Sequence, residues 1–344
     1  MAKPSVVIVS PALADANNGN WQTARRWQRM LAPTYSARIV RQWPDGDAAA
    51  ADVAMLALHA RRSAASVEAW AQTHAGRSNK GSPATRLAVI LTGTDLYRDI
   101  QSDAAAQRSL ALATQLVVLQ AHGLTDLPAP HRPKTRVIFQ STGARQPVAK
   151  PARMLRAVMV GHLRDEKSPE TLFEAARLLA QHPDIRIDHI GDPLDPALGE
   201  QAHATAAQCP GYRWLGGLPH GATRARIQRG HLLVHTSRME GGAHVIMEAV
   251  RSGTPVLASR VPGNIGMLGD GYAGYFPHGD AAALAALMLR CRAGLADPAG
   301  PGNPADDLFS RLDAQCRERA PLFAPETERA ALMQLVRDLL PEKP

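Results

Sequence analysis

One stretch of the sequence combines two carboxylates with paired glycines in a pattern that could bind an anion together with hydroxyl groups. Residues 232–250, LLVHTSRMEGGAHVIMEAV, are expected to form a strand, a tight turn and a helix. Gly241 and Gly242 allow a ligand close to the backbone, and free N–H groups at the helix start favour an anion. Glu240 lies in the turn, and Glu248 lies roughly two helical turns further along.

These carboxylates indicate what else such a site would bind. Ionised carboxylates only accept hydrogen bonds, so their natural partners beside a phosphate are the hydroxyls of a sugar or a ribose. A nucleotide sugar supplies both phosphates and hydroxyls. The alternative is that Glu248 simply complements the helix dipole, which would account for that residue but not for the whole ensemble.

The rest of the chain alternates short apolar runs with segments of helical periodicity, which is typical of parallel sheets with crossover helices. In the first half the expected strands are residues 5–10, 53–59, 86–92, 115–120 and 137–139. After an aperiodic, proline-containing stretch at residues 143–153, strands are expected at residues 155–161, 185–190, 212–215, 232–235 and 255–258. The sequence therefore predicts an α/β protein of two Rossmann-like, doubly wound domains that face a central cleft.

The expected domain boundaries follow from the same patterns. An N-terminal domain is expected over residues 1–148 and a C-terminal domain over residues 149–315. Residues 297–307, DPAGPGNPADD, read as a loop. The last helical segment, residues 316–344, is expected to pack back toward the N-terminal domain.

Composition narrows the possible functions. Of 344 residues, 45% are hydrophobic and 20% charged, which suits buried cores. The net charge of +8 favours anionic ligands, but the basic residues are scattered and only 4% of residues are aromatic, which argues against nucleic acid as a partner.

No stretch approaches the ~20 apolar residues of a membrane span, so no membrane insertion is expected. Cys209, Cys291 and Cys316 lack disulfide or zinc spacing, which fits a cytoplasmic protein.

These motifs resemble the retaining glycosyltransferases of GT-B fold in the glycogen-synthase-like, family 4-like class. The resemblance rests on E-x7-E at Glu240 and Glu248, on SGTPVLAS at residues 252–259, on G-x-L-x-x-x-K ending at Lys167, and on the late Gly279-Asp280. It implies that Glu248 binds the ribose hydroxyls, Glu240 contacts the transferred sugar and Lys167 neutralises the departing diphosphate. A cation is expected there because negative charge builds on the leaving group as the anomeric bond breaks.

Three departures from the family pattern alter the implied donor site. His162 stands where the family has arginine, so Arg164 is expected to meet part of the diphosphate charge. Residues 240–243 read EGGA where EGFG is common, and residues 261–267 lack a glutamate often found there. The expected donor contacts are Gly19, Asn20, His162, Arg164, Gly241, Gly242, Ala243, His244 and Glu248. No metal or other cofactor is expected, since no Asp-x-Asp pair lies at a strand end.

Segments of the first half narrow the resemblance further. Residues 11–27, 57–63 and 91–100, together with GHLRDEK and SRMEGGAH, are similar to the selenosugar synthases of selenoneine biosynthesis. That similarity implies transfer of N-acetylglucosamine, or glucose, from its UDP donor to selenophosphate, with formation of a carbon–selenium bond. It also implies handover of the selenosugar to a downstream enzyme.

A small, multiply charged acceptor needs several donors of positive charge or hydrogen bonds, and arginine suits it because its planar fork donates two parallel hydrogen bonds. The expected acceptor ligands are Arg25, Arg61, Arg62, Thr94 and Arg98. His59 and Asp95 are expected catalytic residues, although a core histidine and a helix cap explain the same residues. An anionic selenium nucleophile requires no strong general base.

Two other activities fit the same patterns. One is conventional transfer from a UDP sugar to an alcohol or carbohydrate, and the other is epimerisation of UDP-N-acetylglucosamine, which needs no acceptor site. The arginines of the first half favour a small anionic acceptor over a bulky glycan. The sequence leaves open whether the anomeric configuration is retained or inverted.

Overall fold

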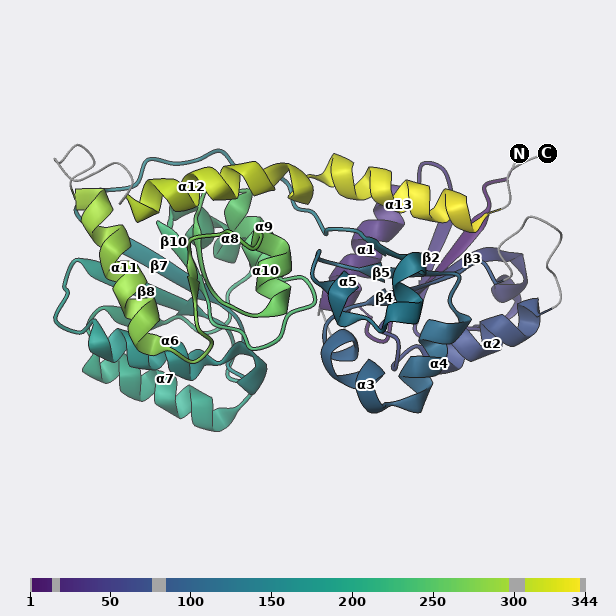
Figure 1. Ribbon diagram of the computed structural model, residues 1–344, viewed down its shortest axis with the longest axis horizontal. Coiled ribbons are helices and arrows are strands. Elements are labelled where there is room, and N and C mark those ends of the chain that lie inside the picture. The colour runs from purple at the N-terminus through teal and green to yellow at the C-terminus, as the bar shows by residue number, and fades with distance from the viewer. Residues whose placement is uncertain (1, 14–18, 76–84, 297–306, 341–344) are drawn as a thin grey trace. The chain divides into compact units, whose positions relative to one another are not determined.

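The computed structural model describes residues 2–13, 19–75, 85–296 and 307–340. It divides into two compact units: the first comprises Met1–Ser141 with Pro325–Pro344, and the second comprises Thr142–Ala324 (Figure 1). Within the described residues, each unit is built around a six-stranded parallel sheet with interleaved helices. The expected fold class, two doubly wound α/β domains, is confirmed.

The first unit has the strand order β2-β1-β3-β4-β5-β6. Its strands are β1 (Ser5–Val9), β2 (Ser36–Val40), β3 (Asp52–Leu58), β4 (Leu87–Leu91), β5 (Gln115–Val118) and β6 (Thr135–Val137). Its helices are α1 (Gly19–Leu31), α2 (Ala64–His74), α3 (Ile100–Ser102), α4 (Ala104–Leu112), α5 (Gly123–Asp126) and α13 (Pro325–Leu339), with a π-helical turn at Asp95–Asp99.

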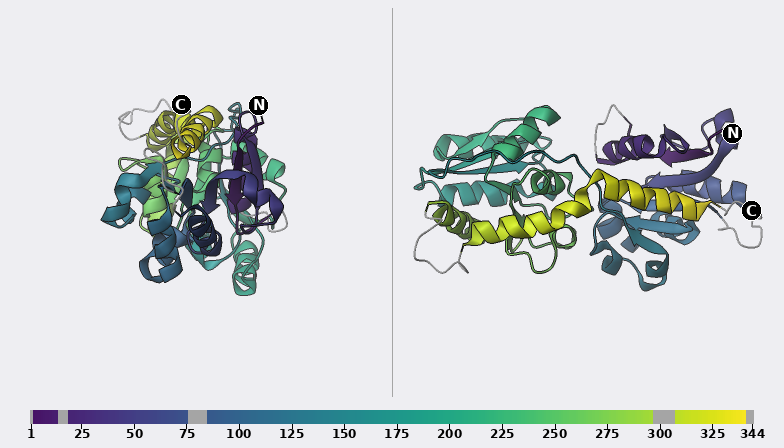
Figure 2. Two further views of the ribbon diagram at one scale, coloured as in Figure 1. Left: turned by 90° about the vertical axis from the view of Figure 1, so that its right-hand side faces the viewer. Right: turned by 90° about the horizontal axis from the view of Figure 1, so that it is seen from above.

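Alternating residues of the central strands feed two separate cores of the first unit. On β1, Val7 packs in a core that contains Trp70, whereas Val6 packs in a core that contains Trp27. Helix α13 contributes Leu335 and Val336 to the Trp27 core, so the end of the chain covers the face on which α1 also lies. Figure 2 shows α13 beside the purple N-terminal elements of the same unit.

The second unit has the strand order β12-β11-β10-β7-β8-β9. Its strands are β7 (Leu155–Val160), β8 (Ile185–Ile190), β9 (Tyr212–Trp214), β10 (Leu232–His235), β11 (Val256–Ser259) and β12 (Tyr275–Phe276). Its helices are α6 (Pro169–Leu178), α7 (Pro196–Gln208), α8 (His220–Arg229), α9 (His244–Val250), α10 (Pro262–Leu268), α11 (Ala281–Ala296) and α12 (Leu308–Arg319). β10 pairs directly with β7, so the loops that follow these two strands leave the same edge of the sheet.

The bounds of the units differ from the expected 148/149 and 315/316. The first unit ends at Ser141, and the chain returns to it only at Pro325. The stretch after residue 142 belongs to the second unit because Lys150 Nζ donates to Gly253 O at 3.0 Å. Helix α12 belongs there too, since Arg319 Nε donates to Met267 O at 3.0 Å.

Two strands, β2 and β12, were absent from the sequence prediction. Both lie at a sheet edge, where β2 is only partly buried and β12 has two residues, so neither shows an apolar run. Residues 14–18 of the segment 11–27 and most of the loop expected at 297–307 lie outside the described residues. Among the described helices, none combines the length and apolarity that crossing a bilayer demands.

Candidate active site

Lys167 and Glu240 meet at the edge of the second sheet where β7 and β10 end. Lys167 closes a short 3-10 turn, Asp165–Lys167, and Glu240 lies between β10 and α9. Lys167 Nζ donates to Glu240 Oε1 at 2.6 Å, and their side chains are only 17% and 12% exposed. The pair is therefore shielded enough for each charge to constrain the other.

Hydrogen bonds and glycines hold the two loops in contact. Thr236 Oγ1 donates to the Lys167 carbonyl at 2.7 Å, and the Arg238 N–H donates to the Glu166 carbonyl at 3.0 Å. A Cβ on Gly263 would lie 1.9 Å from the Glu240 carbonyl oxygen, so any larger residue there would displace the loop.

A buried histidine that sequence reasoning missed completes this group. His235 is the last residue of β10, and its Nε2 lies 3.2 Å from Glu240 Oε1. Burial opposes ionisation of Glu240, yet the Lys167 charge and the nearby His235 outweigh it and hold the pKa of Glu240 far below its usual range. Burial lowers the pKa of His235. The available signal was a histidine that ends an otherwise apolar strand beside the glycine turn.

The second carboxylate, Glu248, contacts two basic side chains of α8. Its side chain is 10% exposed, and its Oε1 lies 2.7 Å from His220 Nε2 and 3.8 Å from Arg224 Nη1. Arg224 is buried and also donates to Thr142 Oγ1 at 2.5 Å. Neither α8 residue was among the expected donor contacts, since only the tertiary fold brings α8 to α9.

The other expected donor contacts are spread over several loops. Gly241, Gly242 and Ala243 form the turn before α9, which begins at His244. His162 Nδ1 accepts from the Asp192 N–H at 3.0 Å, and Arg164 Nε lies 3.7 Å from Glu166 Oε2. Gly19 and Asn20 open α1 of the first unit.

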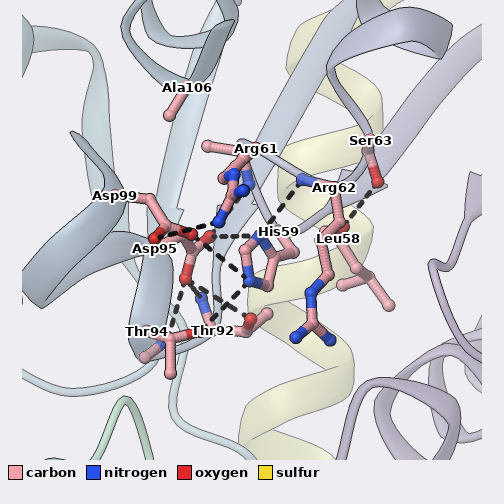
Figure 3. Close-up of polar contacts among 12 residues, drawn as sticks. Leu58, His59, Arg61, Arg62, Ser63, Thr92, Thr94, Asp95, Asp99 and Ala106 are labelled. Atoms are coloured by element: carbon pink, nitrogen blue, oxygen red, sulfur yellow. Dashed lines mark hydrogen bonds and ion pairs between the residues drawn. The ribbon is translucent and has the colours of Figure 1, made fainter. Parts of the chain in front are cut away.

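In the first unit, candidate residues gather where β3 and β4 end (Figure 3). His59 directly follows β3, is 2% exposed and has a φ of 72°. Its Nδ1 accepts from the Arg62 N–H at 3.3 Å, and its Nε2 lies 3.1 Å from Thr94 Oγ1. Burial, the largest influence, lowers the pKa of His59.

Asp95 ties the two loops together from a fully buried position. Its Oδ2 accepts from the Ala60 N–H at 2.9 Å, and its Oδ1 accepts from the Thr92 and Gly93 N–H groups at 2.8 and 3.0 Å. The carboxylate thus bridges the β3 and β4 ends through backbone groups. Asp95 therefore holds the two loops together. A simple helix cap, the alternative suggested by the sequence, would bond only to its own helix.

The expected acceptor arginines differ in their partners. Arg61 Nε lies 3.0 Å from Asp103 Oδ2, and Arg98 Nε lies 3.2 Å from Asp99 Oδ1. Arg62 is exposed, and Figure 3 shows its side chain turned away from Asp95 and Asp99. Arg25 is exposed on α1.

Comparison with known families finds a match within the second unit. Residues 141–291 match the model of the family "Glycosyl transferases group 1". Over these residues, the second unit is similar to the glycosyltransferase group 1 domain. The matched segment contains Lys167, His235, Glu240 and Glu248, so all four side chains described above belong to it.

Relatives of the chain carry a similar domain or the same fold. Glycosyltransferase 1 domain-containing protein 1 of Xenopus tropicalis is 25% identical over 199 residues, which cover 51% of this chain and 57% of that protein. Sucrose-phosphate synthase from Thermosynechococcus elongatus superposes with a TM-score of 0.73 at 18% identity, over 98% of this chain and 99% of that one. Anabaena HepE in complex with UDP-glucose has a TM-score of 0.67 at 14% identity, over 97% and 99%.

A further structural neighbour covers less of its own length. A mutant of S. aureus TarM, in complex with Fondaparinux, alpha-GlcNAc-glycerol and UDP, has a TM-score of 0.56 at 13% identity, over 82% of this chain and 55% of that one. Together with the two six-stranded parallel sheets, these neighbours establish the two-domain GT-B fold that the E-x7-E resemblance implied.

The contact of His220 with Glu248 predicts a raised pKa for His220, which can be measured. The hydrogen bond to the carboxylate outweighs burial and raises the pKa of His220. In an NMR titration, we therefore expect His220 to titrate above the ~6.5 of an unperturbed histidine, and to return toward it in Glu248→Gln. Because the histidine gains a partner on folding, the stabilising effect is present below its ordinary pKa and is lost as pH rises through the raised value. An unchanged titration in Glu248→Gln would exclude the contact in solution.

Proposed function

We propose that this protein is a glycosyltransferase that moves N-acetylglucosamine or glucose from a UDP donor to selenophosphate and so forms a carbon–selenium bond. The observation that carries the transferase assignment is the shielded Lys167–Glu240 pair in the segment that matches the group 1 family, with Glu248 on the following helix. The UDP, UDP-glucose and GlcNAc-glycerol named with the HepE and TarM structures support a UDP-sugar donor.

The second unit supplies the groups that the donor half of the reaction needs. We expect Glu248 to accept hydrogen bonds from the ribose hydroxyls and Glu240 from hydroxyls of the sugar. We expect Lys167 to stabilise the negative charge that develops on the diphosphate. In the free protein the positive charge of Lys167 is matched by Glu240. A bound diphosphate must therefore draw Lys167 away from an existing partner.

The transfer step balances without a cofactor. An electron pair on selenium forms the bond to the anomeric carbon, while the bond from that carbon to the diphosphate oxygen breaks and its electron pair leaves with UDP. Hydrolysis of the selenium–phosphorus bond by water then gives the selenosugar and orthophosphate. Because the nucleophile is already an anion, the step needs no side chain that removes a proton.

The first unit fits an acceptor of this kind better than an alcohol. An alcohol would need a general base within hydrogen-bond reach of its hydroxyl. His59, an imidazole at this edge, is 2% exposed and both its nitrogens already contact protein groups. Arg62, by contrast, is an exposed cation at the same strand end.

The proposal is tested with the purified protein, UDP-N-acetylglucosamine and selenophosphate. We expect UDP release that depends on selenophosphate, with a product whose mass contains selenium and the hexosamine. UDP-glucose, orthophosphate in place of selenophosphate, and glycerol as an alcohol acceptor serve as comparison reactions. Equal UDP release with and without selenophosphate would contradict the acceptor, and transfer to glycerol would favour conventional alcohol glycosylation.

A further inference from the structure

His59 adopts a backbone conformation that few side chains tolerate. Its φ of 72° lies in the left-handed region, where Asn, Asp and His are the non-glycine residues found most often. The residue is nevertheless 2% exposed and fixed at both ring nitrogens. Strain of this kind persists only where the surroundings over-determine the conformation, and it concentrates at functional sites.

The two hydrogen bonds define where the imidazole carries its proton. The Arg62 backbone N–H can only donate, so the Nδ1 that accepts from it at 3.3 Å carries no hydrogen. The proton therefore sits on Nε2, which donates to Thr94 Oγ1 at 3.1 Å. Since this bond uses a lone pair of the hydroxyl, Thr94 keeps its own hydrogen to donate to a ligand.

One imidazole thus connects two of the groups that could contact an anion. Through Nδ1 it fixes the backbone of Arg62, and through Nε2 it orients the hydroxyl of Thr94. Thr94 is partly exposed and Arg62 is exposed, so both can reach a ligand while His59 itself is buried.

The negative charges of the two carboxylates around His59 are balanced by other groups of the same cluster. Asp95 and Asp99 each place an oxygen 3.8 Å from an imidazole nitrogen. The Asp95 oxygens accept from backbone N–H groups of both loops, and Asp99 faces Arg98 at 3.2 Å and Arg61 at 3.8 Å. Among the described residues, no carboxylate lies within ion-pair distance of the Arg62 guanidinium, whereas Arg61 and Arg98 each have a carboxylate partner.

We infer that His59 is a neutral positioning residue of a small-anion site whose ligands are the Thr94 hydroxyl and the Arg62 guanidinium. The chemistry selects a phosphate-like group, because a planar guanidinium and a hydroxyl donor match its oxygens. The inference rests on the proposed function, which it deepens by assigning the acceptor anion to named groups. It also removes His59 from the set of proton-transfer residues.

The test measures binding of thiophosphate and of UDP to the full chain by calorimetry. Thr94→Val and Arg62→Ala are expected to weaken thiophosphate binding by about tenfold or more, the loss typical of a charge-assisted hydrogen bond, and to leave UDP affinity unchanged. Arg61→Ala should cost less than Arg62→Ala, since Arg61 is already paired. Arg108→Ala, a paired and exposed arginine on α4, serves as the control.

Two substitutions at position 59 separate positioning from proton transfer. His59→Asn tolerates the left-handed φ and keeps an acceptor for the Arg62 N–H, but its amide nitrogen stops one bond short of the Nε2 position, so thiophosphate affinity should fall less than in His59→Gly. His59→Gly relieves the strain but removes both bonds, and should bind about tenfold more weakly. In the catalysed reaction, His59→Asn should keep the pH profile of kcat.

Three results would contradict the inference. A pH-dependent collapse of kcat in His59→Asn would make His59 an acid or base and overturn the inference. Wild-type protein that binds UDP but not thiophosphate would eliminate the anion site while sparing the donor half of the proposed function. Wild-type protein that binds neither would overturn both.

Discussion

Replacing Lys167 by alanine is expected to lower kcat by about 100- to 1000-fold, the usual cost of removing one preorganised group that stabilises transition-state charge. The donor KM should change much less. In the free protein Lys167 Nζ lies 2.6 Å from Glu240, so the attraction to bound diphosphate largely replaces an attraction that already exists. The additional charge that develops on the leaving group has no such offset, and its loss therefore appears in kcat. Steady-state kinetics with the donor varied at saturating acceptor measures both constants.

Three comparison variants make this result interpretable. Lys167→Arg keeps the cation and should recover part of kcat. Arg177→Ala removes an exposed arginine of α6 that pairs with Glu174, and should leave both constants unchanged. Glu240→Gln frees Lys167 from its carboxylate and should bind UDP more tightly while turning over more slowly. If Lys167→Ala retained the wild-type kcat, the proposed role of the pair would be wrong.

Replacing Glu328 by alanine is expected to cost the first unit about 3 to 5 kcal/mol of unfolding free energy, as for other broken buried ion pairs. The Glu328 side chain is fully buried on α13. It accepts from Arg26 Nε at 2.8 Å, from Trp27 Nε1 at 2.7 Å and from the Ser141 N–H at 2.8 Å. Counting the Ser141 hydroxyl, which also donates to this carboxylate, alanine would leave four donors without their acceptor, and the shielded Arg26 without its counter-charge.

Tryptophan fluorescence during guanidinium unfolding reports mainly on the first unit and therefore measures this loss of stability. Trp21, Trp27, Trp43 and Trp70 all belong to the first unit, whereas Trp214 belongs to the second. Glu326→Ala changes an exposed carboxylate on the same helix and should stay within about 0.5 kcal/mol of the wild type. A fluorescence transition of Glu328→Ala that coincides with that of Glu326→Ala would show that α13 is not anchored by this carboxylate.

Arg26 illustrates where sequence reasoning stopped. It directly follows Arg25, an expected acceptor ligand near the start of the first helix, and nothing in the local sequence distinguishes the two arginines. Arg25 is exposed, but Arg26 is held by Glu328, some three hundred residues later in the chain. Adjacent helix residues point about 100° apart, so one can face solvent while the other faces a packed helix.

The sequence by itself determined the two doubly wound units and the segments from which the candidate site is built. Apolar runs reveal buried parallel strands because helices cover both sheet faces, and glycines reveal where loops must approach closely, as at Gly263 beside Glu240. Periodicity and turn chemistry are local properties, so they can be read without knowing the fold.

Only the tertiary structure decided which charges compensate each other. The contacts of Lys167 with Glu240, Glu248 with His220 and Arg26 with Glu328 each join segments far apart in the chain. Arg61 and Arg62 are adjacent in sequence, yet one is paired with Asp103 and the other is turned away from the acidic residues. Electrostatic energy depends on distance and burial in the folded molecule, and neither quantity is encoded in the spacing of residues along the chain.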